Sequence, residues 1–271
     1  MLTTRIISAL VAAAVLIGIM QFGPIVISVC AVGLALWCLM EAYSVFSYHK
    51  NPVFLAIGLI VCLGMPFYQM WTFKEMFGFG FVFLLIMIIT MVCRPKKISF
   101  TDISNMSLLT VLIPLSFALL IFLRQDAING HHYVWLSCIG AFCTDSGAFF
   151  MGIALKGPKL CPDLSPKKTI SGSVGGFVGS LIGFFVYAMI LWYGYGISVN
   201  LLPYYGLALL CGLTAQLGDL TASSIKRSRN VKDFGNVIPG HGGFLDRVDS
   251  LMFVAPTVYI YIITFGMQVI L

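Results

Sequence analysis

The sequence predicts an all-α, polytopic integral membrane protein with about nine transmembrane helices and a cytoplasmic amino terminus. Of its 271 residues, 59% are hydrophobic and only 10% are charged, whereas soluble globular chains carry roughly 25% charged residues. Apolar runs of about 20 residues, long enough to cross a bilayer as a helix, recur along the chain. Strands of a membrane barrel would alternate apolar and polar residues, and these runs do not.

Breaks between the apolar runs define the predicted spans. The spans cover about residues 6–21, 22–42, 53–72, 76–93, 106–123, 133–155, 173–193, 203–222 and 250–270. The first run follows Arg5 and has the pattern of a signal peptide. We interpret it as a first transmembrane helix, because the next apolar run begins directly after Pro24.

Lysine and arginine are distributed unevenly among the connections between these spans. With nine spans, 14 of the 16 basic residues fall on one side, and Lys74 and Arg124 fall on the other. Cytoplasmic loops carry an excess of Lys and Arg, so we expect a protein of the cytoplasmic (plasma or inner) membrane whose active site faces the cytoplasm. The net charge of +6 reflects this topology and does not indicate nucleic-acid binding.

The chain divides by this reading into two parts. Residues 1–130 hold about five spans. Residues 131–271 hold about four spans and the two longest polar connections, about 156–172 and 223–249, both on the cytoplasmic side. We therefore expect the second part to be the catalytic region.

Asp145 stands inside the sixth predicted span, in the run Cys143-Thr144-Asp145-Ser146-Gly147. A charged aspartate at the centre of a membrane helix costs about 2.5–3.5 kcal/mol on insertion scales, so it should face protein or a wet cavity. It is either a ligand for a cation or a substrate hydroxyl, or an aspartate satisfied by neighbouring hydroxyl groups. The sequence leaves both alternatives open.

Two adjacent lysines, Lys167 and Lys168, lead into the seventh span. Cationic side chains at the start of a helix suit a phosphate group, although lysine pairs are also common as plain cytoplasmic anchors. Gly175, Gly179 and Gly183 follow at intervals of four. That spacing places small residues on one helix face and predicts close packing against another helix.

The most polar stretch of the chain joins the last two spans. Asp219 closes the eighth span, Asp246 opens the ninth, and Asp249 lies one turn further on. If the two helices are antiparallel neighbours, these acids meet on the cytoplasmic side. Mg²⁺ prefers one or two protein carboxylates completed by waters and substrate phosphate oxygens, so we predict a magnesium site at Asp219 and Asp246, with Asp249 and Asp145 as further candidates.

Cations and glycines surround these acids. Glycine lets backbone N–H groups approach an anion closely, and the mixture with lysine and arginine suits a metal-bound polyphosphate. A cytoplasmic loop with ordinary surface ion pairs is the alternative. Together with the lysine pair, the candidate phosphate-binding residues are Lys167, Lys168, Lys232, Arg247, Gly242 and Gly243.

The run S-x-I-K-R-x4-K-D-F-G-x2-I-P-G-H-G-G-x2-D-R-x-D, residues 223–249, resembles the long motif of the phosphatidate cytidylyltransferases, also called CDP-diacylglycerol synthases. The segments CTDSGA and SPKKT resemble two shorter motifs of the same family. The resemblance covers about residues 133–260. It implies a membrane enzyme of phospholipid biosynthesis that converts CTP and phosphatidate to CDP-diacylglycerol and pyrophosphate.

The resemblance also implies a set of roles. Asp219 and Asp246 would bind Mg²⁺, with a monovalent cation such as K⁺ nearby, and the protein would be a homodimer in the lipid bilayer. Lys226, Arg227 and His241 would complete the catalytic set by lying at the nucleotide or lipid phosphate. A phosphate monoester has a second pKa near 6 and is already a nucleophilic anion at neutral pH, so His241 is expected to orient a group rather than act as a base.

The chain departs from the family pattern at two places. Ile153 stands where relatives usually show arginine, and Ser171 stands where they usually show glutamate. Two other classes of function stay open at this point. One is a cytidylyltransferase for a different lipid phosphate, such as an ether or isoprenoid lipid. The other is an ion-coupled transporter, since such carriers also use intramembrane acids and glycine-broken helices.

Overall fold

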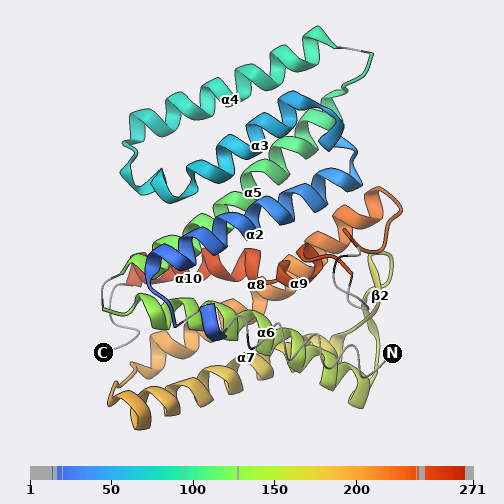
Figure 1. Ribbon diagram of the computed structural model, residues 1–271. Helices are drawn as coiled ribbons and strands as arrows, with labels where there is room; N and C mark the ends of the chain where they lie inside the picture. Colours follow the sequence, from blue (N-terminus) through green and yellow to red (C-terminus); the bar gives the residue numbers. More distant parts are fainter. Residues whose placement is uncertain are drawn as a thin grey trace. The chain divides into compact units, whose positions relative to one another are not determined.

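The computed structural model describes residues 14, 17–19, 21–94, 96–126, 128–235, 237 and 242–265. Figure 1 shows that almost all of this chain is helical. The α-helices are α2 (Pro24–Val45), α3 (Pro52–Gly64), α4 (Phe73–Cys93), α5 (Phe100–Gln125), α6 (Gly130–Leu155), α7 (Ile170–Ile190), α8 (Leu201–Ser228), α9 (Leu245–Val248) and α10 (Leu251–Phe265). Short 3₁₀ segments follow α2 and α3, at Tyr48–Lys50 and Met65–Met70, and a π turn at Leu191–Tyr195 extends α7.

Eight helical segments within the described residues are long and apolar enough to cross a membrane. They are Pro24–Val45, Pro52–Met70, Phe73–Cys93, Phe100–Gln125, Gly130–Leu155, Ile170–Tyr195, Leu201–Ser228 and Leu245–Phe265. These segments confirm the prediction of an all-α polytopic membrane protein. The first predicted span, about 6–21, lies mostly outside the described residues, so the ninth span and the cytoplasmic amino terminus stay predictions.

Local capping explains where several helices begin. The Asn51 side chain accepts a hydrogen bond from the backbone N–H of Val53, and Pro52 occupies the first position of α3, where a missing N–H costs nothing. Before α4, Thr72 and Glu75 bond reciprocally to each other's backbone N–H groups. These polar residues separate one apolar run from the next.

The chain clusters into two compact units by its internal contacts. The first consists of Met1–Phe122 and Phe234–Leu245, and the second of Leu123–Asp233 and Asp246–Leu271. The predicted division into residues 1–130 and 131–271 stays a prediction. In the first unit the largest fully buried side chains include Tyr43, Phe54 and Met106.

The second unit is a bundle in which α6, α7, α8 and α10 pack together. Its α6–α7 interface is lined by glycine, as predicted from the Gly175, Gly179 and Gly183 spacing. A Cβ atom at Gly183 would lie 2.6 Å from Sγ of Cys143, and one at Gly147 would lie 2.8 Å from Cα of Gly179. Side chains at these positions would force the two helices apart, so the packing prediction is confirmed.

A small hairpin departs from the all-helical prediction. Strands β1 (Lys159–Cys161) and β2 (Ser165–Thr169) pair antiparallel between α6 and α7. Lys167 and Lys168 lie on β2, and α7 begins only after its N-cap, Thr169, which accepts a hydrogen bond from the N–H of Gly172. The lysine pair leads into α7, as predicted, but the pairing of the hairpin holds these residues extended rather than in the first turn of the helix.

Candidate active site

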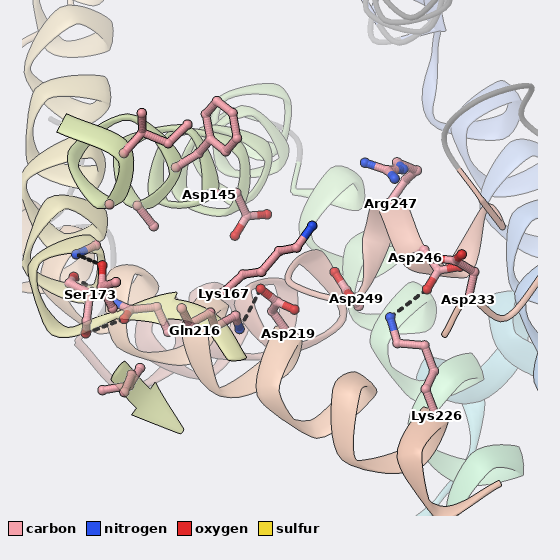
Figure 2. A pocket seen from close by; sticks show the side chains of 18 residues that line it. Asp145, Lys167, Ser173, Gln216, Asp219, Lys226, Asp233, Asp246, Arg247 and Asp249 are labelled. Carbon is pink, nitrogen blue, oxygen red and sulfur yellow. Dashed lines mark hydrogen bonds and ion pairs between the residues drawn. The ribbon is translucent and has the colours of Figure 1, made fainter. Parts of the chain in front are cut away.

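A cavity of about 640 Å³ lies within the second unit and gathers most of the residues predicted for the site. Its size falls in the range of roughly 300–1,000 Å³ that is usual for small-molecule sites. Figure 2 shows the side chains that line it. The charged ones are the acids Asp145, Asp219, Asp233, Asp246 and Asp249 and the cations Lys167, Lys168, Lys226 and Arg247.

Four separate elements bring these acids to one place. Asp145 comes from α6, Asp219 from α8 and Asp246 from α9, and Asp249 lies in the turn between α9 and α10. Gly218 makes one of these approaches possible. A Cβ atom at that position would lie 2.7 Å from the carbonyl oxygen of Asp249, so the backbone of α8 packs directly on the turn that carries Asp249.

Two lysines neutralise two of the acids. Nζ of Lys168 lies 2.6 Å from Oδ2 of Asp219, and Nζ of Lys226 lies 2.7 Å from Oδ1 of Asp246. The side chains of the first pair are 23% and 34% exposed, whereas those of the second are 12% and 4% exposed. The Lys168–Asp219 pair is therefore more accessible from water than the Lys226–Asp246 pair.

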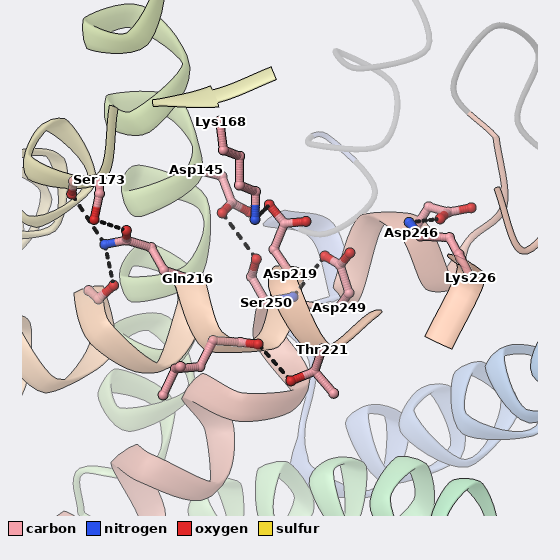
Figure 3. Close-up of polar contacts among 12 residues, drawn as sticks. Asp145, Lys168, Ser173, Gln216, Asp219, Thr221, Lys226, Asp246, Asp249 and Ser250 are labelled. Atoms are coloured by element: carbon pink, nitrogen blue, oxygen red, sulfur yellow. Dashed lines mark hydrogen bonds and ion pairs between the residues drawn. The ribbon is translucent and has the colours of Figure 1, made fainter. Parts of the chain in front are cut away.

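Ser250 links two of the remaining acids, as Figure 3 shows. Its hydroxyl donates to Oδ1 of Asp145 at 3.0 Å, and its backbone N–H donates to Oδ1 of Asp249 at 2.8 Å. Hydrogen bonds of this kind stabilise a carboxylate that burial would otherwise disfavour. Ser250 thus ties α6 to the turn before α10 at the wall of the cavity.

A second polar link fixes α7 against α8 beside the cavity. The Gln216 amide accepts a hydrogen bond from the Ser173 hydroxyl at 2.5 Å and donates to the Ser173 carbonyl oxygen at 3.2 Å. Gln216 stands three residues before Asp219 on α8 and Ser173 lies four residues after the N-cap Thr169. The link therefore holds the two backbone segments that carry Asp219 and Lys168 (Figure 3).

The donor set suits a hard divalent cation. Carboxylate oxygens are the protein ligands that Mg²⁺ prefers, and it needs only one or two of them when phosphate and water complete the shell. No group of three or more His, Cys, Asp or Glu residues within the described part of the chain is arranged to hold a metal ion. Asp219 and Asp246 line one cavity, which fits a cation that is completed by its substrate.

Some predicted site residues lie elsewhere in the structure. Arg227 and Lys232 are exposed, and the guanidinium of Arg227 donates to the carbonyl oxygen of Val231 at 3.1 Å. Neither is among the described residues that line the cavity. Gly242 and Gly243 belong to the first unit.

His241 lies outside the described residues. The predicted roles of five residues therefore stay predictions: His241, Arg227, Lys232, Gly242 and Gly243.

Some polar residues at the cavity were given no role from the sequence. Among them, Asp233 and Gln216 line the cavity, and Ser250 bonds to Asp145, which also lines it. Asp233 lies within the motif of residues 223–249 and Gln216 lies seven residues before it, so their position was the available signal. Ser250 follows the motif directly, and only the folded backbone shows that it reaches Asp145.

The two departures from the family pattern have different surroundings. Ile153 lines the cavity together with Ala148, Phe149 and Gly152, so one wall formed by α6 is apolar. Phe149 and Ile153 are exposed. The hydroxyl of Ser171 instead donates to the carbonyl oxygen of Lys156, just after α6, and bonds to the hydroxyl of Thr169 on β2, so it holds α7 against the end of α6.

Comparison with known proteins identifies the family. The sequence model described as Cytidylyltransferase family matches residues 3–265. The chain belongs to the cytidylyltransferase family. A phosphatidate cytidylyltransferase of Staphylococcus aureus (strain COL) is 32% identical over 266 residues, which cover 96% of this chain and 98% of that protein. One of Bacillus subtilis (strain 168) is 34% identical over 189 residues, covering 69% of this chain and 67% of that protein.

These relatives confirm the resemblance inferred from residues 223–249. The matched region of the cytidylyltransferase family also includes α2 to α5, so membership extends well beyond the segment that carried the sequence argument. The helices of the first unit are therefore part of the family fold, and not an unrelated addition.

Proposed function

We propose that the protein transfers a cytidylyl group from CTP to phosphatidate, giving CDP-diacylglycerol and pyrophosphate for phospholipid biosynthesis. The observation that carries the proposal is the cavity of the second unit, where five acids and four cations meet beside an apolar wall. The names of the full-length relatives support the same reaction.

The chemistry of the reactants decides what the side chains have to do. An oxygen of the phosphatidate phosphate attacks the α-phosphorus of CTP, a new P–O bond forms, and the bond to pyrophosphate breaks. The attacking phosphate is an anion at neutral pH, since its second pKa is near 6. A strong base is therefore unnecessary, and the main obstacle is the repulsion between two polyanions.

The cations of the cavity address that repulsion. Lys167 extends into the cavity in Figure 2, and Arg247 lines it. Lys168 and Lys226 are held by Asp219 and Asp246. We infer that these lysines exchange their aspartate partners for phosphate oxygens when CTP binds, which releases both carboxylates for a cation.

Asp219 and Asp246 are the residues that would hold Mg²⁺, with Asp145 and Asp249 beside them. When bound, the ion would neutralise charge on the phosphates and on the leaving pyrophosphate. A monovalent cation such as K⁺ and a homodimer are carried by the family resemblance alone and remain predictions.

The apolar wall suggests how the lipid is received. Phe149 and Ile153 are exposed on a helix long enough to span the membrane, and both line the cavity. We propose that the acyl chains of phosphatidate stay in the bilayer beside this wall while its phosphate reaches the lysines. CTP would come from the cytoplasm, in line with the distribution of basic residues.

The test uses purified protein in phospholipid nanodiscs with CTP, Mg²⁺ and phosphatidate. Pyrophosphate release that requires phosphatidate, together with a CDP-diacylglycerol spot on thin-layer plates from labelled CTP, would support the proposal. Ether-lipid and isoprenoid phosphates, tested in parallel, decide between lipid acceptors. Pyrophosphate release that is equal with and without any lipid phosphate would contradict it.

A further inference from the structure

Glu41 is a buried acid on a membrane helix of the first unit. It lies on α2, within the run of residues 34–42, in which all the other residues are apolar, and it is 7% exposed. A carboxylate in such surroundings is costly unless it is well paired, and an ionisable residue inside a membrane span is by default a candidate for a functional role. Within the run, Trp37 offers the one side-chain N–H, and no basic residue is present.

The partners of Glu41 are backbone groups far away in the chain. The N–H of Phe244 donates to Oε1 at 2.9 Å, and the N–H of Leu245 donates to Oε2 at 2.8 Å. The indole Nε1 of Trp37 also donates to Oε1, at 3.2 Å. Each carboxylate oxygen thus accepts one backbone N–H group, in bonds that the negative charge strengthens.

The other end of the same segment also meets this carboxylate. A Cβ atom at Gly235 would lie 2.9 Å from Oε1 of Glu41. Both ends of the segment Phe234–Leu245 therefore lie at the side chain of Glu41. At each end of this segment the chain continues into the second unit. Asp233, just before the segment, and Asp246, just after it, both line the cavity.

We propose that Glu41 is a positioning residue for the transfer reaction. By accepting the N–H groups of Phe244 and Leu245, it fixes the backbone that continues directly into Asp246 and Arg247. Glu41 itself touches neither substrate, and it acts through the segment that it holds. The inference rests on the proposed function, because positioning of Asp246 matters for activity only if the cavity is the reaction site.

The geometry requires a carboxylate and not merely a polar side chain. Glutamine has the same shape, but it offers one carbonyl oxygen and one NH₂ group. In Glu41→Gln, one of the two backbone N–H groups would therefore face another donor. Aspartate keeps both acceptor oxygens on a shorter side chain, so Glu41→Asp should recover part of what glutamine loses.

Two control variants separate positioning from general stability. Trp37→Phe removes the indole bond and leaves both backbone bonds intact. Thr110→Val removes a buried hydroxyl that lies 2.5 Å from the Tyr43 hydroxyl, elsewhere in the first unit. It therefore weakens the same unit without touching the segment.

The experiment measures kcat, the KM for CTP, and hydrogen–deuterium exchange of the peptide that covers residues 242–249. We expect Glu41→Gln to lower kcat about 10- to 100-fold, as loss of an outer positioning bond does, while KM changes less. Exchange in that peptide should speed up. Glu41→Asp should lie between Glu41→Gln and the wild type in both readouts, and the two control variants should keep kcat and exchange close to the wild type.

Two results would overturn the inference. One is a Glu41→Gln protein with wild-type kcat and wild-type exchange at residues 242–249. The other is an equal loss of kcat in Thr110→Val, which would show that the first unit merely needs to be stable. A wild-type protein that releases no pyrophosphate would contradict the proposed function instead, and the exchange measurement would still decide whether Glu41 holds the segment.

Discussion

In the first unit the carboxylate of Glu41 is held by backbone N–H groups, whereas in the second unit Asp219 and Asp246 are each held by a lysine. Backbone donors are fixed by the fold and cannot turn to another acceptor. A lysine amine sits on a flexible stem with rotatable donors and can turn to a different anion.

This difference separates two uses of a buried charge. An acid paired with the backbone stabilises one conformation of a loop. In an ion pair of an acid with a lysine the two charges balance each other until a ligand arrives, and the lysine can then bind phosphate while the acid binds a cation. The second arrangement suits a site whose charged substrate comes and goes.

The largest effect is expected from Asp246→Asn, which removes a carboxylate from the cavity and keeps its shape. We expect kcat to fall by about 10²–10³-fold, the loss that follows removal of one group that stabilises charge in a transition state. Turnover with CTP, phosphatidate and Mg²⁺ measures it. Asp163→Asn, at the exposed turn of the hairpin, is the matched control and should keep its rate.

Near wild-type turnover in Asp246→Asn would show that this acid is not a metal ligand. It would also remove the contrast between exchangeable and fixed carboxylates, because Asp246 would then have no part in the reaction.

The two lysine pairs should differ in their effect on stability. Lys226→Met removes the lysine that pairs with Asp246, whose side chain is 4% exposed, and breaking a buried pair costs about 3–5 kcal/mol. Lys168→Met leaves an aspartate that is 34% exposed, and exposed pairs contribute about 0–1 kcal/mol. Unfolding in mixed detergent micelles compares the two variants.

Both lysine variants should bind CTP more weakly than the wild type. If Lys168→Met lost as much stability as Lys226→Met, the more accessible pair would be a structural bond, and the proposed exchange of lysine from aspartate to phosphate would not hold.

Close packing at Gly218 should have an intermediate effect. In Gly218→Ala the new Cβ would lie 2.7 Å from the carbonyl oxygen of Asp249, a backbone atom that cannot move aside easily. Overpacking of this kind costs about 1–3 kcal/mol, and activity should fall because the turn that carries Asp249 shifts. Gly206→Ala, on the same helix, is the control, because its Cβ would meet the end of the Tyr261 side chain, with the hydroxyl at 3.0 Å, and no backbone atom within 4 Å.

Equal stability and equal turnover in the two alanine variants would show that the approach of α8 to the turn is looser than the structure indicates. Asp249 would then not depend on Gly218 for its place in the cavity.

The spans were predictable because a bilayer admits few alternatives. Within lipid every backbone polar group must be satisfied internally, so a long apolar run becomes a helix. The meeting of Asp219 and Asp246 at one cavity followed from a similar argument, since one helix ends and the next begins on the same side. Both acids line the cavity, although their roles as metal ligands remain predictions.

Other features depended on contacts that no local pattern contains. The strand that carries Lys167 and Lys168 reads Ser-Pro-Lys-Lys-Thr, in which apolar and polar residues do not alternate. The bond from Phe244 to Glu41 joins residues that are 203 positions apart. The sequence around Glu41 is apolar on both sides, so only the folded chain reveals what its carboxylate holds.

The smallest effect is expected from Ser250→Ala, which tests whether the acids without lysine partners need a fixed donor. The variant loses the hydroxyl bond to Asp145 but keeps the backbone bond to Asp249. A single hydrogen bond of this kind contributes about 0.5–1.5 kcal/mol, or more to a charged group, so stability and turnover should fall modestly. Ser250→Thr keeps a hydroxyl and should restore turnover if the bond is what matters. If Ser250→Ala instead lost as much activity as Asp246→Asn, Ser250 would act directly in the reaction. Its hydroxyl would then be neither a fixed partner of Asp145 nor one that a substrate displaces.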